Sequence, residues 1–165
     1  MLLCVLFKVL FELLNSSDHS SQMTAFQLLL ESLERPVDWV YRVWDTLVFE
    51  LESVEADQRA QAGQLLSYLA ISDTEFKMEA VFPKIWQATY DQNRAVADTI
   101  LQATWRIGLA SPKHKTILLQ AYKSRFDEAV SLGEEGEQIC LTILRNMKKL
   151  YLSEQEKQTL SLLRT

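Results

Sequence analysis

Turn-forming residues are scarce in this chain of 165 residues, which contains only four glycines and three prolines. Strand-rich folds need frequent tight turns, whereas long helices with short connections do not. The hydrophobic share of 48% is far from that of a disordered protein, and the length suits one domain with a full core. We therefore expect a single all-helical domain.

Cysteine and histidine are equally scarce, with two residues of each. Cys4 and Cys140 form neither a disulfide framework nor a CxxC pair, which favours a reducing, cytoplasmic setting. The chain has no GxSxG turn, no HExxH motif, no Cys/His cluster of metal spacing and no Walker or GxGxxG loop. Glutamates flank Gly133 and Gly136 and would repel a phosphate. The sequence therefore predicts no catalytic residue, no metal and no cofactor.

Positive charge is in the minority, since the net charge is −5. This balance opposes non-specific binding to nucleic acid. The window from Thr99 to Phe126 is an exception: it contains no acid and five cations, so it carries +5 and the rest of the chain −10. One of the five cations is Arg106. The other four are the candidate contacts to phosphate or another anion: Lys113, Lys115, Lys123 and Arg125.

An apolar leader opens the chain, from Leu2 to Leu14, with only Lys8 and Glu12 interrupting it. It is shorter than the roughly 20 residues of a transmembrane helix and lacks the basic start of a secretory signal, so we expect no stable membrane insertion. Three interpretations of residues 1–22 stay open. They form a capping helix, an interfacial or signal-like segment, or an addition upstream of a true start at Met23. Residues 23–165 form the main domain.

Helical periodicity continues through that domain with short breaks. It predicts helices at 23–34, 37–52, 57–71, 75–90, 93–110, 114–131, 135–151 and 154–164. Pro36 suits a first helical turn, and Ser111 with Pro112 separates two helices. Ser153 followed by Glu156 has the pattern of a capping box, which predicts the start of the last helix.

Two stretches repeat one pattern: Arg59 to Ala70 reads RAQAGQLLSYLA, and Arg94 to Trp105 reads RAVADTILQATW. Each has a small residue three positions after the arginine and a leucine seven positions after it, and a third copy starts at Glu137. Offsets of 3, 7 and 10 lie on one face of a helix. The pattern predicts these buried positions: Ala62, Leu66, Leu69, Ala97, Leu101, Cys140, Leu144 and Met147.

The helix before each copy carries an aromatic residue, Trp44, Trp86 or Phe126, at separations of 42 and 40 residues. A helical hairpin of about 40 residues is in the range of HEAT-type repeats. The pattern Arg59-x-x-Ala62-x-x-x-Leu66-x-x-Leu69 resembles HEAT and HEAT-like repeats, as does Pro83 inside a first helix. The resemblance covers roughly Pro36 to Tyr151. The third unit departs from it, with Glu137 in place of arginine and no inner proline.

This resemblance implies a short right-handed α-α superhelix, a HEAT-like solenoid of about three helical hairpins. Helices at 23–34 and 154–164 would cap it, with Leu28, Leu29, Leu33, Leu160, Leu162 and Leu163 facing inward. It also implies a non-enzymatic module that binds another protein through a concave face lined by the second helices, like short bacterial HEAT-repeat proteins without an assigned activity. The candidate contacts on that face are Arg59, Arg94, Asp98, Gln102, Trp105 and Arg106.

Structural interpretations of the same residues stay open. Arg59 and Arg94 fit salt bridges to Asp57, Asp91 or Asp98 that stiffen the stack, and Trp105 fits a wedge between units. HEAT-like alkylpurine DNA glycosylases imply a second function, nucleic-acid binding, with the acid-free window as phosphate contacts and Trp105 as a stacking platform. HEAT-like bilin lyases imply a third, for which no residue here argues.

Overall fold

The computed structural model describes residues 9, 12–14 and 16–163, without the side chain of Leu163, and these residues form helices and turns but no strand. The all-helical prediction is confirmed. The α-helices are α2 (His19–Ser32), α3 (Trp44–Glu50), α4 (Ala56–Leu69), α5 (Met78–Ala88), α6 (Arg94–Ala103), α7 (Pro112–Ser131) and α8 (Glu137–Leu163). Short 3-10 helices are η1 (Val40–Arg42), η2 (Ala70–Ser72), η3 (Thr104–Leu109) and η4 (Gly133–Gly136). Most of the apolar leader lies outside the described residues, so the structure does not test its three interpretations.

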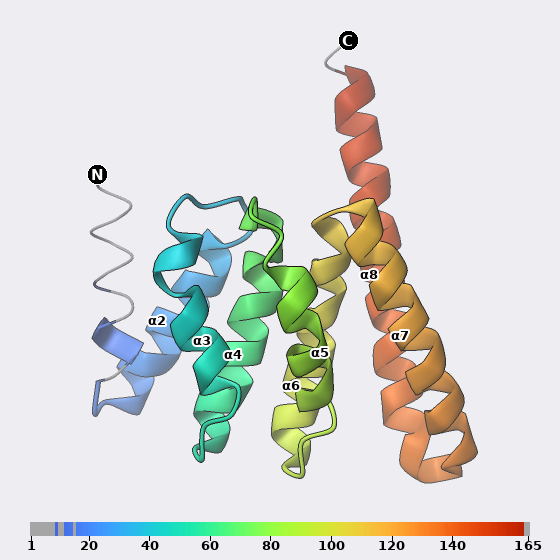
Figure 1. Ribbon diagram of the computed structural model, residues 1–165, viewed down its shortest axis with the longest axis horizontal. Coiled ribbons are helices and arrows are strands. Elements are labelled where there is room, and N and C mark those ends of the chain that lie inside the picture. The colour runs from blue at the N-terminus through green and yellow to red at the C-terminus, as the bar shows by residue number, and fades with distance from the viewer. Residues whose placement is uncertain (1–8, 10–11, 15, 164–165) are drawn as a thin grey trace.

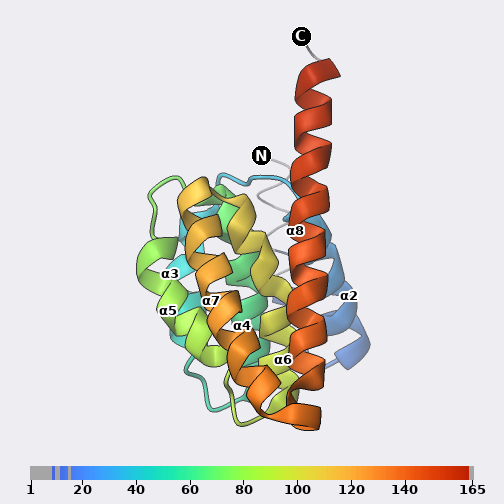
Figure 2. The same ribbon diagram turned by 90° about the vertical axis from the view of Figure 1, so that its right-hand side faces the viewer.

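Helices α3 to α8 form three successive pairs that stack side by side in two layers (Figures 1 and 2). In one layer α4 contacts α6 and α6 contacts α8, while α3, α5 and α7 form the other layer. Helix α2 covers the first pair at the N-terminal end of the stack (Figure 1). The three copies that begin at Arg59, Arg94 and Glu137 therefore lie along one common layer, as the repeat predicts.

One hydrophobic core runs through the stack. Ala62, Leu66, Leu69 and Leu101 are buried in it as predicted, and Ala97 is half-buried. Trp44 is fully buried. Each large aliphatic or aromatic side chain buried in this way contributes about 1.5–3 kcal/mol. A single hairpin cannot bury such a face alone, so the pairs stabilise one another.

The third copy does not follow the predicted burial. Cys140 is half-buried, and Leu144 and Met147 are 52% and 43% exposed. The core side of α8 is made instead by Ile143 and Leu150. The reason is position in the stack: a further helix pair lies beside α4, whereas no described element lies beside the outer face of α8.

The predicted helix 37–52 begins only at Trp44, after turns and η1. Val37, Val40 and Val43 are β-branched and lose side-chain freedom in a helix. The Val37 N–H donates to Ser72 Oγ at 3.0 Å, which holds this segment against η2 at the end of α4. The placement of Pro36 in a first helical turn is therefore wrong.

The C-terminal prediction of two helices, 135–151 and 154–164, is also wrong, because one helix, α8, runs without a break from Glu137 to Leu163. Neither glycine nor proline interrupts this helix, and no helix begins at Ser153. The end of α8 stands clear of the rest (Figure 1), with Leu160 and Leu162 exposed instead of capping the core. At the other end α2 does cap the stack through Leu29 and Leu33, although Leu28 is exposed.

Ser111 and Pro112 form the predicted boundary. The Ser111 side chain accepts a hydrogen bond from the His114 N–H at 3.2 Å, and Pro112 takes the first turn of α7. The predicted helix 93–110 is divided between α6 and η3. That division positions the candidate site.

Candidate functional site

Three of the candidate contacts form one row along the outer side of α6. Arg94, Asp98 and Gln102 are four residues apart, so they lie on one helical face, and the side chains of Arg94 and Asp98 are 75% and 36% exposed. Arg94 Nε lies 3.7 Å from Asp98 Oδ2, so the expected ion pair to Asp98 is present, but it lies within α6 and does not join two units. Gln102 is exposed. The row offers a cation, a carboxylate and an amide to solvent.

Trp105 and Arg106 continue this row on η3. The guanidinium carbon of Arg106 lies 3.7 Å from the Tyr68 ring centroid and 4.8 Å from that of Trp105. Arg106 also forms a two-pronged ion pair with Glu34, with Nη1 to Oε2 at 3.1 Å. Lys149 Nζ lies 6.0 Å from the Trp105 ring. We call these five residues the Trp105 platform: a half-buried indole with two cations near its ring.

The platform exists because α6 changes to a 3-10 helix at Thr104. The Leu101 carbonyl accepts from Thr104 Oγ1 and from Asn146 Nδ2, each at 2.7 Å, which satisfies it where the α-helix ends. Ile107 and Gly108 are buried, and a Cβ on Gly108 would lie 3.0 Å from a Leu150 methyl. Close packing of η3 against α7 and α8 therefore sets the outward direction of Trp105 and Arg106.

The sequence did not predict three members of the platform. Tyr68 has a weak signal, because it precedes the buried Leu69 of the repeat and so lies off the core face. Glu34 and Lys149 have none, because they come from distant segments, the turn after α2 and helix α8, and reach Arg106 and the indole only in the folded chain.

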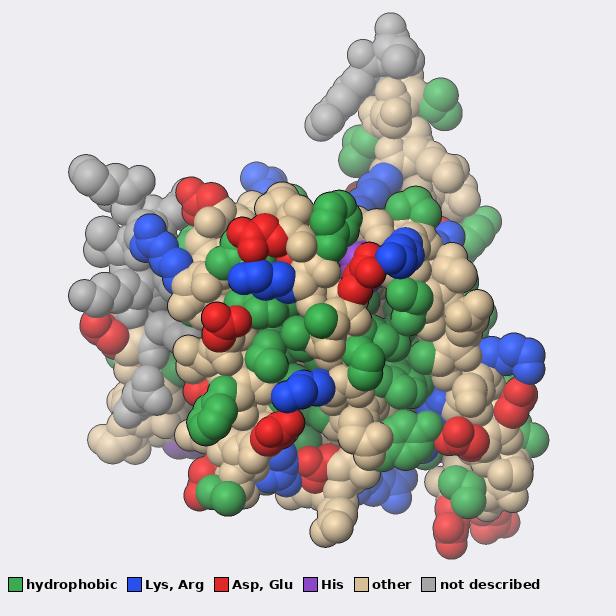
Figure 3. Space-filling model, in the orientation of Figure 1, with side chains coloured by type: hydrophobic (Ala, Val, Ile, Leu, Met, Phe, Trp, Pro, Cys, Tyr) green, Lys and Arg blue, Asp and Glu red, His purple; other side chains and the backbone are tan. Residues whose placement is uncertain are grey.

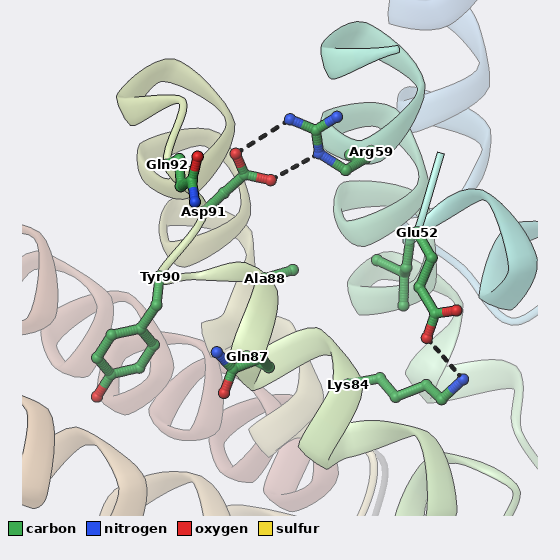
Figure 4. Close-up of a pocket in the computed structure, with 9 residues that line it drawn as sticks. Glu52, Arg59, Lys84, Gln87, Ala88, Tyr90, Asp91 and Gln92 are labelled. Atoms are coloured by element: carbon green, nitrogen blue, oxygen red, sulfur yellow. Dashed lines mark hydrogen bonds and ion pairs between the residues drawn. The ribbon is translucent and has the colours of Figure 1, made fainter. Parts of the chain in front are cut away.

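Arg59 lies apart from the platform, at a shallow cleft of about 470 Å³ between the first two helix pairs (Figure 4). Its Nε and Nη2 donate to the Asp91 carboxylate at 2.6 and 3.1 Å, and its Nη1 donates to the carbonyls of Ser53 and Val54. These bonds from Arg59 lower the pKa of Asp91, and the same carboxylate raises the pKa of Arg59. The structural interpretation of Arg59, a salt bridge between units, is confirmed.

The rest of that cleft is also charge-paired. Lys84 Nζ lies 3.0 Å from Glu52 Oε1 across the opening (Figure 4). Tyr90 donates to Glu128 at 2.7 Å, and burial raises the pKa of its phenol. The lining contains no histidine, cysteine or serine. The cleft joins two helix pairs and has no nucleophile paired with a base.

The basic window of the sequence is neutralised in the fold. Acids from other segments pair with Lys113, which meets Glu79 at 2.6 Å, and with Lys115, which meets Glu154 at 2.7 Å. Acids on α7 itself pair with the other two: Lys123 with Asp127 at 2.7 Å, and Arg125 with Glu128 at 3.5 Å. On the face shown in Figure 3, Lys and Arg side chains likewise lie next to Asp or Glu side chains. The four cations point to different sides of α7, so they do not form a continuous basic surface.

The part of the chain that the structure describes has no group of three or more His, Cys, Asp or Glu side chains that could hold a metal ion. No helix in that part has both the length and the hydrophobicity for crossing a bilayer. Comparison with protein-family models, with curated proteins and with solved structures finds no match to this chain. A proposal about function therefore rests on the geometry of the Trp105 platform and of the row on α6.

Proposed function

We propose that this chain is a non-enzymatic interaction module, a short HEAT-like right-handed superhelix that binds a segment of another protein through its concave face, which the second helices α4, α6 and α8 would line. The observation that carries the proposal is the Trp105 platform. A tryptophan and an arginine, the residue types most enriched in binding hot spots, lie together on one face with the indole half-exposed.

The platform is held in place before any partner arrives. The Arg106 side chain is only 11% exposed and is fixed by Glu34 on one side and by the Tyr68 ring on another. An anchor whose side chains are already ordered loses less conformational entropy on binding. A partner that covers the indole would also remove its remaining exposed area from water.

The row on α6 supplies the polar contacts beside this anchor. From Arg94 to Trp105 the helix rises about 16 Å, which matches about five residues of an extended chain. Such a segment would place an apolar or aromatic side chain on Trp105 and its polar groups near Gln102, Asp98 and Arg94. The setting that we propose is cytoplasmic, in keeping with the low cysteine content.

The nucleic-acid alternative lacks a comparable observation. Its support in the sequence was the basic window, whose cations have acidic partners in the structure. A protein that binds phosphates gains affinity by releasing counterions from unpaired cations. We therefore prefer a protein partner.

The test compares Trp105→Ala with a matched control, Phe49→Ala. Phe49 is exposed on α3, in the other layer. The tagged full-length chain is used to capture proteins from its native cell extract at several salt concentrations, with quantitative mass spectrometry. We expect proteins that the wild type and Phe49→Ala recover equally and that Trp105→Ala loses by about tenfold or more. Equal recovery by all three chains, or no protein above background, would overturn the proposal.

A further inference from the structure

The last helix pair leaves an apolar surface open at the end of the stack, which faces the viewer in Figure 2. We call it the end face. It consists of Phe126 and Val130 on α7 and of Cys140, Leu144, Met147 and Tyr151 on α8. The four α8 residues are spaced by four, three and four, which is the spacing of a seam that packs against another helix.

We propose that a second copy of this chain covers the end face, with the two α8 helices antiparallel and Leu144 near the two-fold axis. The inference does not rest on the proposed function, because the Trp105 platform takes no part in the contact.

The spacing of side chains on α8 fits a two-fold arrangement. In an antiparallel pair centred on Leu144, a residue n positions after 144 lies opposite the residue n positions before it. Met147 therefore lies opposite Leu141 of the partner, and symmetry repeats that contact. Both side chains are exposed in the single chain. Contacts next to the two-fold axis are therefore apolar on both sides. Farther from the axis, Cys140 lies opposite Lys148 of the partner and Tyr151 lies opposite Glu137 of the partner.

Charge favours this antiparallel arrangement over a parallel one. The start of α8 carries the exposed acid Glu137, preceded by Glu134 and Glu135, whereas its middle carries the exposed Arg145 and Lys148. In the antiparallel pair Lys148 lies within about 4.5 Å, along the helix axis, of Glu137 on the partner. A parallel pair would place each charge beside its own kind, which opposes association.

A hollow on the end face is suited to receive the partner. It measures about 260 Å³, and most of its lining is apolar or aromatic: Tyr122, Phe126, Ile143, Leu144 and Met147. The paired side chains of Lys123 and Asp127 complete it. Side chains of one helix insert into such holes between the side chains of another. Leu141 of the partner, which lies opposite Met147, would fill the hollow, whereas in a single chain its apolar side chains face water.

Sedimentation equilibrium of the full-length chain tests the proposal. We expect the wild type to approach twice 19.1 kDa with rising concentration. Leu144→Arg places a charge on the two-fold axis and should weaken the dimer by about a hundredfold. The matched control is Leu160→Arg, an exposed leucine on the projecting end of the same helix, which should dimerise like the wild type.

A charge exchange identifies the arrangement. Glu137→Lys and Lys148→Glu should each weaken the dimer by about tenfold or more, because each places like charges together at two symmetric contacts. An equimolar mixture of the two variants should dimerise again, since every contact between unlike chains then joins opposite charges. Circular dichroism confirms that each variant is folded.

Three results would overturn the proposal. The first is a wild-type chain that forms no dimer at the highest concentration reached, whether it is free or a single copy is bound to another protein. The second is equal dissociation by Leu144→Arg and Leu160→Arg. The third is a mixture of the charge variants that dimerises no better than either variant alone.

Discussion

A buried chain of hydrogen bonds joins α6, α7 and α8, and it predicts a large loss of stability for Asn146→Ala. Asn146 Nδ2 donates to the Leu101 carbonyl at 2.7 Å and to Tyr122 Oη at 2.9 Å. Tyr122 Oη in turn lies 2.7 Å from Thr104 Oγ1. Because the Thr104 hydroxyl donates to the Leu101 carbonyl, it must accept from Tyr122, and so every proton in the chain is assigned.

The magnitude follows from what the substitution removes. Asn146, Tyr122 and Thr104 are all buried, and each of the two lost bonds is worth about 0.5–1.5 kcal/mol net. The void left by the shortened side chain adds about 1 kcal/mol. We expect a decrease of about 2–4 kcal/mol in the free energy of unfolding. For a domain of this size, that corresponds to a decrease of about 4–16 °C in Tm.

Urea unfolding followed by circular dichroism measures the effect, provided that the slope with denaturant stays constant. Gln120→Ala on the exposed side of α7 is the control and should change stability by less than about 0.5 kcal/mol. Tyr122→Phe should cost about 1–2 kcal/mol. With Asn146→Ala, the double variant should lose less than the sum of the single losses. An Asn146→Ala chain as stable as the control, or strict additivity, would refute the reasoning.

Three further predictions concern the junctions of the stack. Asp91→Asn should lower the temperature midpoint of unfolding at pH 6, because it removes the charged partner of Arg59. Arg59 lowers the pKa of Asp91 in the folded chain below the unfolded value of about 3.9. The stability that this ion pair contributes is therefore present above about pH 3.9 and is lost as the pH falls through the folded-state pKa. The gap to the wild type should therefore narrow by pH 3, and a constant gap would contradict it. Gly63→Ala should lower Tm, because the new Cβ would lie 2.7 Å from Ile100 Cδ1 and overpacking costs about 1–3 kcal/mol; an unchanged or higher Tm would show that α4 and α6 can separate. Gly136→Ala should destabilise the chain far more than Gly133→Ala, because a Cβ on Gly136 would overlap the Ala129 carbonyl oxygen. Gly133 has open space around it, so alanine there meets only the cost of a φ of 63°. Equal losses of stability in thermal unfolding would contradict this prediction.

The sequence by itself determined the helical class and the order of the repeating units. These follow from local properties: the scarcity of glycine and proline, the helical spacing of Ala62, Leu66 and Leu69, and the separation of the aromatic residues. The boundaries that failed have local causes too. β-branched residues shortened the start of α3, and the absence of any helix breaker joined the last two predicted helices into α8.

Only the tertiary structure decided which side chains are free to meet a partner. Arg106 and Lys115 read as cations of a basic window, yet Glu34 and Glu154, which lie 72 and 39 residues away, neutralise them. Leu144 has the periodicity of a core leucine and is exposed because no element of the described residues packs on that side of α8. The spacing of residues along a helix fixes which of them share a face, whereas the neighbour of that face depends on how distant segments pack.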